Sequence, residues 1–289
     1  MTTRKRESSE PIAAEPLRWA VEARLDFLER KLFWEGTANR RDLIERFGVS
    51  EQQASSDLTR YQTMAPDNLV YDKSGKTYRT SEAFAPVLYK PDPNRLLADF
   101  RLLAEGAMGV EALPMAPPLD VARAPIRAVD AIVLRNVLSA IRDRRRLAVD
   151  YTSFTRPEAR RRTIEPHALA FDGFRWHARA RDVEDGAFKD FVLGRLSRTV
   201  LGAESTSSGD EDLDWATRVT LVIAAHPSLS DAQRKAVEMD YGMRRGRAEI
   251  ETRKALLYYT KKRLGLDLKA GARRPEDQHI VLVEERTSA

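Results

Sequence analysis

The sequence predicts an α+β protein of several domains, with a helical N-terminal domain followed by two domains that combine strands and helices. Two stretches of the chain predict this division. Residues 108–125 contain four prolines, which fit poorly in a helix or a central strand. Residues 202–212 are small, polar and acidic, which favours a surface linker. These stretches divide the 289 residues into expected domains at 13–107, 126–201 and 213–285, and this length suits two or three domains.

The composition excludes several classes of protein. With 42% hydrophobic residues the chain can bury cores, and without cysteine it has no disulfide, thiol nucleophile or cysteine-ligated zinc. It has no run of about 18 apolar residues and no apolar signal core, so we expect a cytoplasmic protein without membrane contact. The net charge of +5 is compatible with nucleic-acid binding. The four histidines lack metal-ligand spacing and there is no G-x-S-x-G motif, so we expect no metal, no cofactor and no enzymatic activity.

Three helices are predicted in the N-terminal domain. Apolar residues at spacings of three and four predict a first amphipathic helix with the stripe Leu17, Val21, Leu25, Leu28 and Leu32. A second helix over 39–47 ends at Gly48, the residue type that best adopts a left-handed helix end. Ser50 to Gln53 form a capping-box pattern, which starts a third helix after a three-residue turn. This arrangement predicts a helix-turn-helix, and its expected apolar interior is Leu43, Phe47, Val49, Ala54 and Leu58.

The third helix carries a polar face that suits base reading in a major groove, where glutamine can pair with adenine and arginine with guanine. The residues expected on this face are Ser50, Gln52, Gln53, Ser55, Ser56, Thr59 and Arg60. Residues 69–71 and 77–79 flank a turn with Lys73 and Lys76, which predicts a hairpin wing for backbone phosphates. These features predict a winged helix-turn-helix DNA-binding domain. The alternative is a small helical domain that binds protein.

The middle domain is predicted to be a small, strongly bent sheet or barrel. A helix over 129–143 is expected to turn Ile132, Val133, Val137 and Ile141 inward. Short strand-like runs separated by polar turns follow it at 147–153, 163–169, 174–181, 188–193 and 199–201.

Residues 174–181 read F-R-W-H-A-R-A-R and give the strongest functional signal in the chain. Because strand side chains alternate between faces, Trp176 shares one face with two alanines, and the other face carries Arg175, His177, Arg179 and Arg181. The second face holds no acid, which favours an anion site. The alternative is a solvated strand whose arginines pair with acids elsewhere. With hydroxyl, imidazole and guanidinium donors from neighbouring strands, the expected effector-binding residues are Tyr151, Ser153, His167, Trp176, His177, Arg179, Arg181 and Arg195.

The C-terminal domain is predicted to be a small α/β interaction domain. A buried-type strand over 219–224 precedes a second capping box at Ser230 to Gln233, which opens a helix that ends near Met239. The other expected elements are a strand at 246–251, a helix at 253–264 and a strand at 280–284.

The motifs of the middle domain resemble those of a WYL domain. They occur in the order Tyr151, Glu165-Pro166-His167, Trp176-His177-Ala178 and Asp190-Phe191, followed by Arg195. With the winged helix-turn-helix before it, the chain resembles WYL-domain transcriptional regulators found beside bacterial phage-defence loci such as BREX and CBASS, the BrxR/CapW-like repressors. Residues 17–36 and 240–243 add to this resemblance. The chain departs from the family where the Trp-Tyr-Leu triad appears as Trp-His-Ala at 176–178.

The resemblance implies an Sm-like β-barrel in the middle domain and dimerisation through a small α/β C-terminal domain. It also implies a homodimeric repressor of a phage-defence locus that binds an inverted-repeat operator in double-stranded DNA. A nucleic-acid or nucleotide-like anionic effector at the middle domain would relieve repression. The alternatives are a nucleic-acid-processing enzyme and a constitutive DNA-binding protein without an effector.

Overall fold

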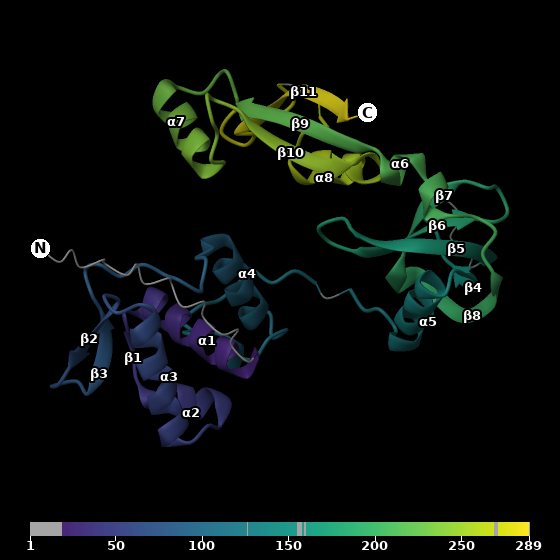
Figure 1. Cartoon of the computed structure of the whole chain (residues 1–289). Helices are drawn as coiled ribbons and strands as arrows, with labels where there is room; N and C mark the ends of the chain where they lie inside the picture. The colour runs from purple at the N-terminus through teal and green to yellow at the C-terminus, as the bar shows by residue number, and fades with distance from the viewer. Residues whose placement is uncertain (1–18, 126, 155–157, 159, 269–270, 289) are drawn as a thin grey trace, which may run out of the picture. The chain divides into compact units, whose positions relative to one another are not determined.

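The computed structural model describes residues 19–125, 127–154, 158, 160–268 and 271–288. The chain forms two compact units, which join between Ala124 and Pro125, at the end of the proline-rich stretch. Figure 1 shows the helices and strands of each unit.

The first unit combines helices with a small antiparallel sheet, whose strand order is β1-β3-β2. Its elements are α1 (Trp19–Glu35), β1 (Thr37–Ala38), α2 (Arg40–Phe47), α3 (Glu51–Met64), β2 (Leu69–Asp72), β3 (Thr77–Thr80), α4 (Pro93–Ala104) and the 3₁₀ turn η1 (Val110–Ala112). Helices α2 and α3 form the predicted helix-turn-helix, and β2 and β3 form the predicted wing. Strand β1 follows α1 directly and pairs with β3, so the wing is tied to the end of α1.

Capping residues set the ends of α2 and α3. Gly48 closes α2 with φ 65°, the left-handed conformation predicted for it. Asn39 opens α2 through a capping box that was not predicted. At α3 the Ser50 side chain accepts from the backbone N–H of Gln53, as predicted. The Gln53 side chain donates to Asp57 at 3.0 Å, so only the Ser50 half of the predicted capping box forms in the described chain.

The core of the first unit lies between its first three helices. Leu25, Leu28 and Leu32 of α1 are fully buried, as their spacing predicts. They pack against the helix-turn-helix through Leu43, Ala54, Leu58 and Tyr61, with Phe47 and Val49 half-buried at the edge. Leu17, the predicted start of this stripe, lies outside the described residues.

A buried carboxylate fixes the chain where it leaves the wing. The Glu29 side chain is fully buried in α1 and accepts a hydrogen bond from the Tyr61 hydroxyl at 2.8 Å. It also accepts from three successive backbone N–H groups, those of Val87, Leu88 and Tyr89, at 2.8, 2.7 and 2.5 Å. Four donors therefore compensate the cost of burying this charge. Burial raises the pKa of Tyr61, and its bond to Glu29 adds to that effect.

The middle domain is an antiparallel five-stranded sheet in the order β7-β6-β5-β4-β8, with α5 packed on β4, β5 and β8. Its elements are α5 (Ala131–Arg142), β4 (Arg145–Tyr151), β5 (Arg160–Phe171), β6 (Trp176–Asp182), β7 (Phe188–Val192), the 3₁₀ turn η2 (Leu193–Arg195) and β8 (Leu196–Glu204). All five predicted strands are present. In the described chain β7 and β8 are the two edges of this sheet and do not pair. The sheet is therefore open, and the expected Sm-like barrel is not confirmed.

Helix α5 buries a slightly different stripe from the one predicted. Val133 and Val137 are buried and Ile141 is partly buried, as expected, but Ile132 is 51% exposed. Ala140 is buried in its place. The reason is the helical period, because positions i, i+4, i+7 and i+8 share one face while the residue before them lies about 100° away.

The stretch 202–212 is not the simple surface linker that its composition predicts. Strand β8 continues to Glu204. The hydroxyls of Thr206 and Ser207 then donate to the buried Glu165 at 3.0 and 2.6 Å. Asp212, at the end of the stretch, is only 1% exposed. The polar residues of this stretch therefore form hydrogen bonds and ion pairs with buried charged residues of the sheet.

The C-terminal domain is a three-stranded antiparallel sheet in the order β10-β9-β11, and α7 packs against β9 and α8 against β10. Its elements are the 3₁₀ turn η3 (Gly209–Glu211), α6 (Leu213–Ala216), β9 (Arg218–Ala225), α7 (Asp231–Asp240), β10 (Ala248–Arg253), the 3₁₀ turn η4 (Lys254–Leu256), α8 (Leu257–Arg263) and β11 (Ile280–Ser288). The predicted capping box of Ser230 and Gln233 is confirmed at the start of α7. Across the described chain, every helix is too short or too polar to cross a membrane.

Candidate functional site

Helix α3 presents a polar face at the surface of the first unit. Gln52, Ser56, Thr59 and Arg60 are exposed on it, and Ser50 is exposed at its cap. Two other predicted residues are half-buried and already engaged, because Gln53 donates to Asp57 at 3.0 Å and Ser55 accepts from Arg40 at 3.3 Å. The outer face that remains accessible is therefore narrower than predicted: Gln52, Ser56, Thr59 and Arg60.

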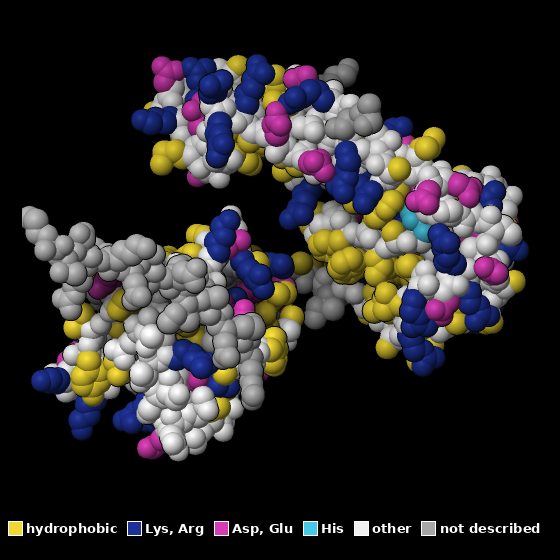
Figure 2. All heavy atoms as spheres, viewed as in Figure 1, with side chains coloured by type: hydrophobic (Ala, Val, Ile, Leu, Met, Phe, Trp, Pro, Cys, Tyr) yellow, Lys and Arg dark blue, Asp and Glu magenta, His cyan; other side chains and the backbone are white. Residues whose placement is uncertain are grey.

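The wing beside this helix is a hairpin with an ordered acidic turn and an exposed basic tip. Asp72 accepts from the backbone N–H groups of Ser74 and Gly75 at 2.9 and 3.0 Å and from Arg79 at 2.8 Å. These contacts, led by the Gly75 N–H, hold the pKa of Asp72 below its usual range. Lys73 and Lys76 are exposed on this turn, and Figure 2 shows basic side chains over the hairpin.

A polar groove of about 590 Å³ joins α2, α3 and the wing. Its walls include Arg40, Ser55, Thr59, Tyr71 and Lys76. Arg40 and Tyr71 were not predicted to belong to the site. The helix-capping residue Asn39 could have indicated from the sequence that Arg40 belongs to the site. Arg40 lies in the first turn of α2, beside unpaired backbone N–H groups that attract phosphates.

The basic strand β6 lies between β5 and β7 and does not present an unpaired row of cations. His177 and Arg179 are 2% and 5% exposed. Every basic residue of this face meets an acid, in the pairs Arg175–Asp172 at 3.0 Å, His177–Asp172 at 2.9 Å, Arg179–Asp212 at 2.7 Å and Arg181–Glu165 at 3.5 Å. This face therefore fits the alternative interpretation, in which its basic residues pair with acids elsewhere in the chain. The two central residues, His177 and Arg179, are however buried and not solvated.

Asp212 is the centre of a buried charge network. It accepts from Arg179 through both oxygens, at 2.7 and 2.9 Å, and from His167 at 3.0 Å. It also caps α6 by accepting from the Trp215 N–H at 3.2 Å. Burial raises the pKa of Asp212, but the contact with Arg179 outweighs it and the pKa is lowered. Burial, together with the nearby charges of Arg179 and Arg253, lowers the pKa of His167 although Asp212 raises it, so a neutral imidazole donates to an ionised carboxylate.

The remaining predicted pocket residues do not all meet at one surface. The Tyr151 hydroxyl accepts from the Val192 N–H at 3.4 Å, and its ring packs on Phe191. Ser153 is half-buried two residues beyond β4. Arg181 also donates to the Gly186 carbonyl at 3.3 Å. Tyr151 and Arg181 thus serve the packing of the sheet.

A surface pocket of about 410 Å³ contains the other two predicted residues, Trp176 and Arg195. Arg127, Phe174 and Arg175 also line it. They are not among the expected effector-binding residues, although Arg175 was predicted on the basic face of the strand. The Arg195 guanidinium also lies 4.1 Å from the centre of the exposed Phe154 ring, a cation–π distance. Exposed rings beside guanidinium groups can stack bases and pair with phosphates. In the described chain no group of three or more acids and histidines could hold a metal ion.

Two buried carboxylates, Glu165 of β5 and Asp172 of the β5–β6 turn, lead us to expect that the second unit becomes less stable in acid. Burial raises the pKa of Glu165, but hydrogen bonds led by that of Ser207 outweigh it and lower the pKa to about 2. Burial likewise opposes the bonds that His177 and the turn backbone make to Asp172, and these lower its pKa to about 2. A carboxylate whose pKa is lower in the folded than in the unfolded chain stabilises the fold. This stabilisation is complete above the unfolded-state pKa of about 4 and is lost as the pH falls through the folded-state pKa.

Urea unfolding of the full chain measured from about pH 6 down to about pH 3 should show this loss. The midpoint of the second unit should fall steadily below about pH 4.5, and Glu165→Gln should make that slope shallower. Asp172→Asn provides an independent second variant. A midpoint that stays constant over this range would contradict the assignment of both carboxylates.

Models of protein families match three successive segments of the chain. The winged helix-turn-helix domain of the BrxR transcriptional regulator matches residues 20–102, the WYL domain matches 132–201, and the BrxR C-terminal dimerization domain matches 218–288. The DNA-binding transcriptional repressor CapW of Stenotrophomonas maltophilia is 38% identical over 270 residues, 92% of this chain and 90% of that protein. CapW of Pseudomonas aeruginosa is 37% identical over 268 residues, 92% of this chain and 89% of that protein. This chain therefore belongs to the CapW family, with a BrxR-type winged helix-turn-helix domain, a WYL domain and a BrxR-type C-terminal dimerization domain.

Proposed function

We propose that this chain is a cytoplasmic, homodimeric transcriptional repressor that binds an inverted-repeat operator and controls a phage-defence locus. The observation that carries this proposal is the exposed face of α3, with Gln52 and Arg60, set beside a basic wing. The relatives are named DNA-binding transcriptional repressors, which supports a regulator and not an enzyme. The BrxR-type dimerization domain supports a dimer that reads two half-sites.

In this proposal α3 enters the major groove and the wing fixes its register. Gln52 and Arg60 have the side chains that pair with adenine and guanine edges. Lys73 and Lys76, exposed on the wing, contact phosphates, which add affinity without sequence information. Arg40, at the first turn of α2, adds a further phosphate contact beside the groove.

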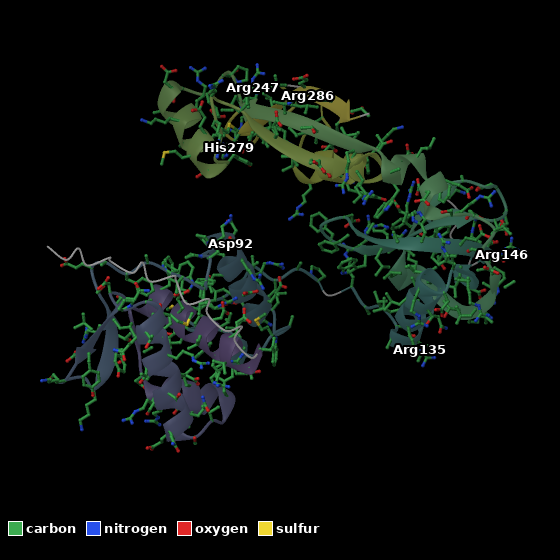
Figure 3. The ribbon with its side chains drawn as sticks, viewed as in Figure 1. Asp92, Arg135, Arg146, Arg247, His279 and Arg286 are labelled. Atoms are coloured by element: carbon green, nitrogen blue, oxygen red, sulfur yellow. The ribbon has the colours of Figure 1, made fainter. Side chains whose placement is uncertain are left out.

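Gel shifts with the promoter upstream of the gene would test this division of roles. Gln52→Ala should weaken operator binding by roughly 5- to 100-fold and leave non-specific binding unchanged, because it removes a base contact. Lys73→Ala should weaken both kinds of binding and lower the slope of log affinity against log salt by about one. Arg135→Ala, on the exposed side of α5 (Figure 3), is the matched control. Equal loss of both kinds of binding in Gln52→Ala would contradict base reading by α3.

The effector site that we propose is the pocket of Trp176 and Arg195, and its effector is a nucleic-acid or nucleotide-like anion. The other predicted cations are held by acids, whereas this pocket combines exposed rings and guanidinium groups at the surface. Arg179→Ala is a poor test, because Arg179 is buried on Asp212 and its loss would unfold the site. Trp176→Ala and Arg195→Ala are sharper tests.

A fluorescein-labelled oligothymidylate of about ten nucleotides suits the usual site sizes of single-strand binders. Its affinity should fall about tenfold in Trp176→Ala and in Arg195→Ala, since one stacked base contributes about 1–3 kcal/mol. Arg135→Ala should bind as the wild type does. Competition by ATP would distinguish a mononucleotide from a longer strand. Equal affinity in all four proteins would exclude this pocket as the site.

A constitutive repressor is the second candidate function. It is favoured by the pairing of Arg175, His177, Arg179 and Arg181 with acids, which is what a purely structural strand requires. In that case Trp176→Ala and Arg195→Ala would leave both operator affinity and induction of the promoter unchanged.

A further inference from the structure

The turn between β5 and β6 is organised around one carboxylate. Asp172 is buried, and its Oδ1 accepts from the backbone N–H groups of Phe174 and Arg175 at 2.7 and 2.6 Å. Its Oδ2 is shared between the Arg175 guanidinium at 3.0 Å and the His177 imidazole at 2.9 Å. Phe174 and Arg175 also line the surface pocket. The same turn therefore positions a wall of the pocket and a buried histidine.

The other side of this turn contacts α8 of the C-terminal domain. The Tyr259 ring centre lies 5.4 Å from that of His177, and its hydroxyl donates to Asp190 at 3.1 Å. Arg263 lies against Gly173, because a Cβ added to Gly173 would be 2.9 Å from its Cδ. Gly173 has φ 97°, a conformation that favours glycine. Helix α8 therefore packs on the turn through Arg263 and on the adjoining strands β6 and β7 through Tyr259.

His177 depends on Asp172 for its position. An ionised carboxylate only accepts, so the His177 Nε2 donates to it. The other ring nitrogen, Nδ1, is buried and has no hydrogen-bond partner among the described residues. Within the described chain, the imidazole is therefore joined to Asp172 by one hydrogen bond and to α8 by its contact with Tyr259.

We propose that this turn couples the surface pocket to α8, with Arg175 as the positioning residue on the pocket side. The inference rests on the proposed effector site. Arg175 is partly exposed, so an anion in the pocket can take its guanidinium from Asp172. Of the residues that the structure describes, Asp172 then keeps only His177 as its side-chain partner, and the packing of Tyr259 on His177 changes. The ligand binds better to the state in which Arg175 has left Asp172. It therefore shifts the equilibrium of the turn and α8 toward that state.

Hydrogen exchange of the full-length protein without ligand tests the coupling directly. Arg175→Ala removes the guanidinium from Asp172, so amides of α8 (257–263) should exchange roughly five- to tenfold faster. Arg175→Lys, which keeps a cation beside Asp172, should restore most of the protection. Arg195→Ala changes the same pocket without contact to Asp172, so it should leave α8 as in the wild type. Unchanged α8 exchange in Arg175→Ala, or an equal rise in Arg195→Ala, would overturn the coupling.

The labelled oligothymidylate separates this inference from the effector proposal. If the strand binds the wild type and speeds exchange in α8, both are supported. If it binds and α8 does not respond, the coupling is wrong and the effector site stands. If it does not bind, the effector proposal fails for this probe, and the ligand-free comparison of Arg175→Ala with Arg195→Ala still decides the coupling. Tyr259→Phe should keep the wild-type affinity for the strand and show a smaller ligand-dependent change in α8.

Discussion

Replacing Asp212 by alanine is expected to lower the unfolding free energy of the second unit by about 3–5 kcal/mol, the usual cost of removing one partner of a buried ion pair. Asp212 is almost fully buried and serves Arg179 through both oxygens. Among the described residues, its loss leaves Arg179 with Asp190, 3.2 Å away, as its one acid partner, and removes the acceptor of His167. Calorimetry of the full chain can measure the change, because it separates the transitions of the two units.

Two further variants identify the cause of that loss. Asp214→Ala removes a neighbouring acid whose pair with Lys254 is half exposed, so it should leave the transition close to that of the wild type. Asp212→Leu combined with Arg179→Leu should recover part of the stability, because the Arg179 charge is then no longer buried without Asp212, while Asp190 keeps its hydrogen bond from Tyr259. A single Asp212→Ala variant that melts with the wild type would show that the network adds little to the fold.

The helix-turn-helix could be predicted well because its signals are local. Gly48, Ser50 and the leucine stripe of α1 act within a few residues of where they stand. The environment of β6 could not be predicted, because its acids come from distant parts of the chain. Asp212 lies 33 residues from Arg179 in a segment whose composition indicates a surface linker. Alternation correctly placed Ala178 and Ala180 in the core, but alternation cannot show what covers the opposite face of a strand.

Only some of the residues that line the pocket of Trp176 and Arg195 could be predicted, for a related reason. Trp176 and Arg195 were assigned from the residue types of β6 and the segment after β7. Arg127 lies before α5, where no periodic pattern extends, and Phe174 lies in the β5–β6 turn, two residues before β6, although the sequence predicts a strand from residue 174. Only the fold of the sheet brings these segments to one surface. The Sm-like barrel is the expectation with the least local support, since strand patterns do not specify whether the two edge strands of a sheet meet.

Replacing Asp57 by alanine is expected to cost the first unit about 3–5 kcal/mol and, through that loss, most of its operator binding. Asp57 belongs to the buried side of α3, where it pairs with Arg24 of α1 at 2.6 Å and accepts from Gln53 at 3.0 Å. Without it a buried guanidinium remains, and α3 loses one polar contact with α1, while the hydrogen bond from Tyr61 to Glu29 stays. Calorimetry should show an earlier transition of the first unit, and gel shifts should show at least tenfold weaker binding, which corresponds to about 1.4 kcal/mol.

The control lies on the outer side of α1. Asp26→Ala removes the partly exposed pair of Asp26 with Arg30, so it should cost less than about 1 kcal/mol and leave operator affinity unchanged. The double variant Arg24→Leu and Asp57→Leu should restore much of the stability. It does not restore the hydrogen bond that Gln53 donates to Asp57. If this double variant melts like the wild type and still binds the operator weakly, Asp57 positions the reading face of α3 as well as stabilising it. If it recovers both properties, the role of Asp57 is stability alone, and the orientation of α3 follows from its apolar core.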